Sequence, residues 1–88
     1  MAHIVTKSGF EIDLSPDVFD DMEVFELIVD VDKGVITKLP DLLGRIFTPA
    51  QKTALYDHCR TDDGRVPISK VSEEFADIMA GMRDAEKK

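Results

Sequence analysis

The residues with the most obvious capacity for chemistry are the acidic turn Asp62-Asp63-Gly64-Arg65-Val66 and the neighbouring pair His58-Cys59. In a calcium-binding EF-hand loop, glycine takes the sixth position and a glutamate supplies oxygen ligands at the twelfth. With Gly64 as the sixth residue, the first would be Cys59 and the twelfth Lys70, and neither side chain offers an oxygen. We therefore interpret this segment as a turn between helices and expect no metal or cofactor.

Nucleophilic catalysis would need a serine, threonine or cysteine, a histidine base and a third group that orients the base. The two histidines, His3 and His58, give no such spacing. Side chains at adjacent helical positions diverge, so His58 and Cys59 do not form a metal-ligand pair. Cys59 is interpreted as a small buried hydrophobe. The sequence predicts no catalytic residue and no metal ligand, and hence a protein that is not an enzyme.

Length and composition limit the class of protein. The 88 residues predict one small domain, which at this size hides only about 60% of its unfolded surface, so a large substrate cleft is not expected. A single cysteine cannot form an internal disulfide, which favours a reducing compartment. Neither an apolar run of membrane-spanning length nor a signal-peptide pattern is present, so a cytoplasmic protein is expected.

The elements that must position these residues begin with a predicted β-hairpin over residues 1–14. Apolar and polar residues alternate in 3–6 and in 10–14, on either side of Lys7-Ser8-Gly9. Ser15 and Pro16 suit the cap and the first turn of a helix that we expect to run to Asp32.

Three further helices are predicted in the rest of the chain. The second spans about 38–47, and the third begins at a capping box formed by Thr48 and Gln51. The last begins near Pro67 and carries a helical apolar stripe of Ile68, Val71, Phe75, Ile78, Met79 and Met82. The predicted fold is mainly α, a small bundle of about four helices with an N-terminal β-hairpin, in which residues 15–83 form the helical body and 84–88 a frayed tail.

The segment from residue 11 to residue 32 contains nine acids and no base, whereas the other residues carry nine acids and eleven bases. Its predicted helix has two apolar stripes on opposite sides, and two interpretations stay open. In the first, the bundle covers both stripes. In the second, one stripe is exposed beside the acids and docks a basic amphipathic helix or a second copy of the chain. The candidate partner-binding residues are then Asp20, Asp21, Glu23, Val24, Leu27, Asp30 and Val31, while Val18, Met22, Phe25 and Val29 form the other stripe.

The net charge of −7 disfavours nucleic-acid binding, because phosphate contacts require clustered lysine and arginine. An acidic helix could instead mimic nucleic acid and occupy the basic groove of a DNA-handling enzyme. An acidic protein-interaction module or such a mimic is therefore the alternative function.

Five motifs follow one another along the chain: Asp20-Asp21-Met22-Glu23, Asp32-Lys33-Gly34, Leu39-Pro40-Asp41-Leu42-Leu43, Gln51 with Leu55, and Asp62-Asp63-Gly64-Arg65-Val66-Pro67. Their order resembles the small tail assembly chaperones of siphophages and prophages of Gram-positive bacteria, over about Phe10 to Met79. The resemblance implies a non-catalytic protein that binds the phage tape measure protein in the host cytoplasm while the major tail protein polymerises around it. It also implies self-association, absence from the mature virion, and no nucleic-acid or membrane partner.

Overall fold

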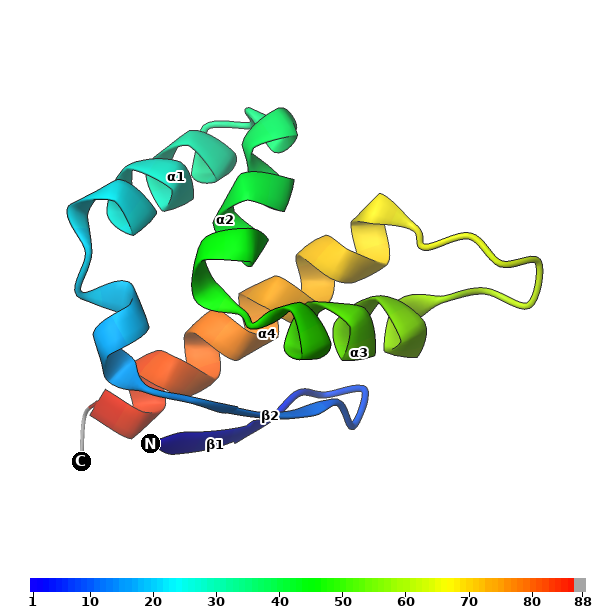
Figure 1. Cartoon of the computed structure of the whole chain (residues 1–88), viewed down its shortest axis with the longest axis horizontal. Coiled ribbons are helices and arrows are strands. Elements are labelled where there is room, and N and C mark those ends of the chain that lie inside the picture. The colour runs from blue at the N-terminus through cyan, green and yellow to red at the C-terminus, as the bar shows by residue number, and fades with distance from the viewer. Residues whose placement is uncertain (87–88) are drawn as a thin grey trace.

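The computed structural model describes residues 1–86 and confirms a mainly helical bundle with an N-terminal hairpin (Figure 1). The longest helix, α4, crosses the molecule behind α2 and α3, and the hairpin packs along it. Helix α1 lies beside α2, on the side away from α3. The elements are β1 (Ala2–Val5), β2 (Glu11–Leu14), the 3-10 helices η1 (Pro16–Phe19) and η2 (Ile36–Lys38), α1 (Met22–Asp32), α2 (Leu39–Ile46), α3 (Pro49–Cys59) and α4 (Ile68–Glu86).

The hairpin forms as predicted, with Ile4 opposite Ile12 in an antiparallel register. Gly9 lies in the turn at a φ of +94°, a conformation that glycine adopts without steric cost. The inner face of the hairpin meets α4 closely at Gly81, where an added Cβ would lie 2.8 Å from Cγ2 of Ile4. The absence of a side chain at this position therefore lets the strand approach the helix.

The outer face of the hairpin carries His3 between two carboxylates. Its Nδ1 lies 2.6 Å from Asp13 and its Nε2 3.0 Å from Glu11. The hydrogen bond to Asp13, followed by that to Glu11, raises the pKa of His3 above 6.5. Because the folded-state pKa is raised, the stabilisation is present below pH 6.5 and is lost as the pH rises through the folded value.

We expect Asp13→Asn to lower the pKa of His3 toward 6.5, because it removes the larger of the two contributions. An NMR titration of the His3 ring protons measures this pKa directly. Asp17→Asn, an exposed acid in η1 outside the hairpin, is the matched control and should leave the pKa unchanged. An unchanged pKa in Asp13→Asn would contradict the hairpin contact.

The acidic segment departs from prediction, because the helix expected from residue 15 to Asp32 is broken in two. Ser15 caps η1 as predicted, accepting a hydrogen bond from the Asp17 N–H. The chain then leaves helical geometry at Asp20, and the carboxylate of Asp21 accepts from the Glu23 N–H to start α1. Two capping residues six positions apart each favour a helix start, and the second interrupts the first helix.

The remaining helices follow the predicted boundaries closely. Gly34 ends the α1 region at a φ of +95°, and η2 precedes α2. The capping box is present, with Thr48 accepting from the Gln51 N–H and the Gln51 side chain accepting from the Thr48 N–H. Helix α4 continues to Glu86, past position 84 where fraying was expected, and residues 87–88 of that tail lie outside the described residues.

The hydrophobic core joins the hairpin to the four α-helices. Its most deeply buried side chains come from four different helices, and the hairpin adds its inner face. Because hairpin and helices share this core, neither is expected to fold without the other. The buried apolar residues are Ile4, Phe10, Ile12, Leu14, Val24, Leu39, Leu42, Leu43, Ile46, Phe47, Leu55, Cys59, Val71, Phe75, Ile78 and Met82.

Candidate functional site

The predicted partner-binding stripe of the acidic segment faces the core. Val24 is only 1% exposed, and Leu27 and Val31 are half-buried against the core, on the side of α1 that packs on α2. The expectation that this stripe is exposed is therefore wrong. An eleven-residue helix cannot stay docked on a small bundle without burying one apolar side, and the side with Val24, Leu27 and Val31 is the one that packs on α2 and the core.

The acids of the predicted site divide into three environments. Arg45 of α2 binds Asp21 at 3.2 Å and Glu23 at 2.9 Å, and the Glu23 N–H, followed by Arg45, lowers the pKa of Asp21. Glu23 and Asp30 line a shallow hollow between α1 and α2, together with Leu27. Asp20 lies outside it, in the break before α1. The structure thus brings together Glu23, Leu27 and Asp30, and whether they bind a partner stays a prediction.

The opposite stripe of α1 is the one that reaches solvent. Met22 is 69% exposed and Phe25 56% exposed, whereas Val18 and Val29 are half-buried. The first interpretation, in which the bundle covers both stripes, therefore also fails. Large exposed apolar side chains at helical spacing are typical of a contact surface.

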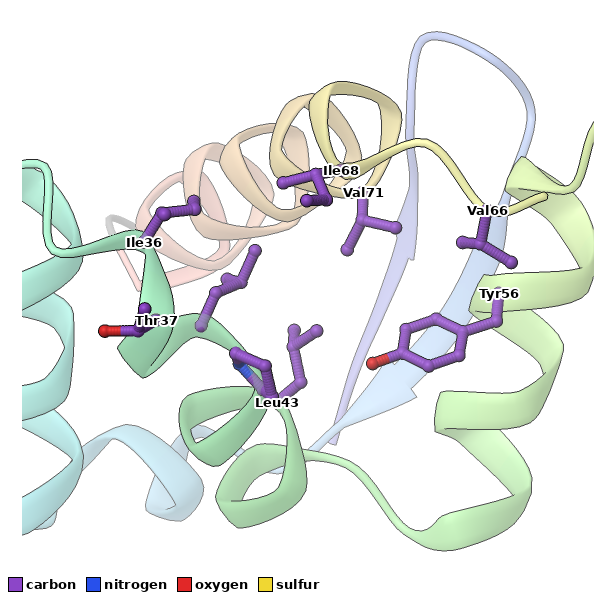
Figure 2. A pocket seen from close by; sticks show the side chains of 9 residues that line it. Ile36, Thr37, Leu43, Tyr56, Val66, Ile68 and Val71 are labelled. Carbon is purple, nitrogen blue, oxygen red and sulfur yellow. The ribbon is translucent and has the colours of Figure 1, made fainter.

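A second apolar surface, absent from the sequence predictions, is a groove between the starts of α2 and α4 and the end of α3 (Figure 2). Its volume is about 380 Å³. Ile36 and Ile68 face each other across its upper edge, and Tyr56 extends into it from α3. Both isoleucines are exposed, Ile68 by 66%. We call this the apolar groove; its lining residues are Ile36, Thr37, Leu39, Pro40, Leu43, Tyr56, Val66, Ile68 and Val71.

Sequence reasoning missed the groove because it assigned Ile68 to the buried stripe of the last helix. Ile68 does lie on the face of α4 that continues as Val71, but it is the first residue of the helix and extends beyond the packed core. The apolar pair Val35-Ile36, directly after Gly34, was the signal that could have found the other edge. Apolar residues in a turn between helices are typical of a contact surface rather than of a solvated loop.

A polar cluster joins the hairpin turn to α3 and α4. The buried carboxylate of Glu74, 7% exposed, accepts hydrogen bonds from Thr6 at 2.7 Å and from Ser8 at 2.8 Å. His58 Nε2 lies 2.8 Å from the Ser8 Oγ and 3.9 Å from Glu74. The backbone N–H of Lys7 donates to Asp77 beside it. The contacts of the hairpin turn with α3 and α4 join residues that are 50 to 70 positions apart, which is why no sequence spacing indicated them.

The cluster brings serine, histidine and glutamate together, but not in the arrangement of a catalytic triad. A triad carboxylate binds the imidazole nitrogen that faces away from the serine, and so orients the base. Here Glu74 binds Ser8 directly and accepts the hydrogen bond of its hydroxyl, so His58 Nε2 is left to donate to the Ser8 oxygen. The neighbouring Cys59 is buried, which raises the pKa of its thiol and disfavours the nucleophilic thiolate. The geometry fits a structural role, in which these side chains hold the hairpin turn on α3 and α4. We call the cluster of Thr6, Ser8, His58 and Glu74 the clasp.

Within residues 1–86, no group of three or more potential metal ligands gathers. The same part of the chain has no helix with the length and apolar character needed to cross a bilayer. No protein-family model, curated protein or solved structure matches this chain.

Proposed function

We propose that this chain is a non-catalytic tail assembly chaperone. It would bind the phage tape measure protein in the host cytoplasm and help the major tail protein to polymerise around it. The observation that carries the proposal is the apolar groove, whose exposed edge residues Ile36 and Ile68 suit the apolar stripe of a partner helix. The motif order described above supplies the identity of the partner.

The groove has the properties that a temporary cover for a helix requires. Its walls come from three helices whose inner faces are already packed in the core, so they need no rearrangement to receive a ligand. It is small, because only nine residues line it, and a small contact favours moderate affinity and release. A tape measure chain exposes long amphipathic helix before the tail tube forms, and several copies of a small chaperone would be needed to cover it. Self-association of the bound copies belongs to the same proposal.

The replacement Ile68→Asp tests the groove. A carboxylate on its edge should lower the recovery of tape measure protein about tenfold, because an interfacial apolar contact is lost and a charge is desolvated. The measurement is affinity capture of the tagged chain from infected host lysate, followed by mass spectrometry. Ser69→Asp adds the same charge at the neighbouring exposed position and should bind like the wild type. Equal recovery with Ile68→Asp would show that the groove is not the binding site.

The acidic segment favours a second candidate function, a nucleic-acid mimic that inhibits a DNA-handling enzyme. Nine acids and no base between residues 11 and 32 are the observation behind it. The same capture experiment separates the two functions. Recovery of a nuclease, polymerase or repressor without tail proteins would support the mimic and contradict the chaperone. For a mimic, this recovery should also fall steeply as the salt concentration is raised.

A further inference from the structure

We infer that the outer face of α1 is a second docking surface, and that its occupant is a basic amphipathic helix. This inference is independent of the tail chaperone assignment, because it depends only on the exposure and charge of α1. We define the outer α1 face as Met22, Phe25, Val29 and Asp32, which point away from α2 at 100° per residue, together with Glu26 at its edge, which also lines the hollow between α1 and α2.

Met22 and Phe25 form the apolar part of this face, because they are three positions apart and both more than half exposed. Residues at this spacing are neighbours on a helix surface, so they form one ridge, with the half-buried Val29 continuing it. Methionine and phenylalanine together fit the apolar stripe of another helix, because the flexible thioether adapts around a rigid ring. The core of α1 is satisfied by its other side, so the ridge is left for a partner.

The charge of the face determines the chemistry of that partner. Glu26 flanks the ridge on one side and Asp32 on the other, and both are exposed. Within the described residues, the ion pairs of α1 and its cap are those of Asp21 and Glu23 with Arg45, and none of them involves Glu26 or Asp32. Lys38 and Arg45 line the hollow beside Glu26 without pairing with it. The nearest base along the chain is Lys33, just after α1. An apolar ridge with acids on both sides complements an apolar stripe with lysine or arginine on both sides.

The two surfaces of the chain differ in chemistry and are expected to choose different partners. No charged residue lines the apolar groove, whereas acids border the outer α1 face. A nucleic-acid mimic would present its acids without interruption, but here Met22 and Phe25 occupy the centre of the face. The ridge therefore favours an amphipathic protein helix over a purely electrostatic contact with a DNA-binding groove.

The test uses two labelled synthetic peptides of about three heptads, long enough to be helical, with leucine at the core positions. One carries lysine at the other positions and the second carries glutamate. Fluorescence anisotropy with the full chain should show binding of the lysine peptide and none of the glutamate peptide. Binding should weaken as salt is raised from about 0.05 to about 0.5 M.

Two single replacements place the peptide on α1. Phe25→Ser should weaken lysine-peptide binding about tenfold, because it removes the centre of the ridge. Val5→Ser removes an apolar side chain of similar exposure on the outer face of the hairpin, away from both α1 and the apolar groove, and should leave peptide binding unchanged. Circular dichroism confirms that both variants stay folded. No binding by the wild type, equal binding of both peptides, or equal affinity in Phe25→Ser and wild type would each overturn the inference.

Discussion

Val24→Asp should remove about half of the stability of the protein, whereas Phe25→Asp, at the next position, should leave the stability nearly unchanged. Val24 is 1% exposed on the side of α1 that packs on α2, so a carboxylate there is buried without a cation. Burial of an unpaired charge costs about 3–5 kcal/mol, about half of the roughly 5–10 kcal/mol that stabilises a domain of this size. The measurement is urea unfolding followed by far-UV circular dichroism.

Phe25→Asp is a stringent control because it introduces the same charge one residue away. Its side chain is more than half exposed, so the loss should be below about 1 kcal/mol. If Val24→Asp unfolds at the wild-type urea concentration, α1 does not pack on α2 as described. The apolar stripe of Val24, Leu27 and Val31, which was predicted to be exposed, would then be free to bind a partner.

The sequence predicted the fold where a local signal sets the structure. The capping box at Thr48, the cap at Ser15 and the glycine turns are interactions between residues at most four apart, and the structure has each of them. Local signals also explain the error between residues 15 and 32. Ser15 and Asp21 both favour a helix start, and the periodicity of apolar residues continued across the break between them.

The candidate surfaces were less predictable, because exposure depends on neighbours that are distant along the chain. Two apolar stripes of α1 looked equivalent in the sequence, and only the position of α2 buries Val24 and leaves Phe25 in solvent. The same holds for Ile68, whose place at the edge of the groove depends on η2 across from it. The contacts of Glu74 with the hairpin turn span 66 and 68 residues, beyond any spacing rule.

Thr6→Val should destabilise the protein by about 2–4 kcal/mol, although the two side chains have nearly the same shape. The Thr6 hydroxyl donates to Glu74 at 2.7 Å and accepts from the buried Phe10 N–H at 3.1 Å. Valine leaves the Phe10 N–H without an acceptor, and it leaves the buried carboxylate of Glu74 with one hydrogen-bond donor fewer. A buried polar group that loses its partner costs about 1–3 kcal/mol. The urea midpoint and its slope measure the change in the free energy of unfolding.

The matched replacement Thr6→Ser separates the hydroxyl from the shape of the side chain. Serine keeps both hydrogen bonds and loses one methyl group, so it should cost only about 1 kcal/mol. The loss in Thr6→Val should appear as one cooperative transition, because the hairpin carries Ile4, Phe10, Ile12 and Leu14 of the shared core. Equal stability of Thr6→Val and the wild type would show that the clasp adds nothing to folding.

Because the clasp joins the hairpin to α4, and the start of α4 forms one edge of the apolar groove, a weakened clasp should also loosen the groove.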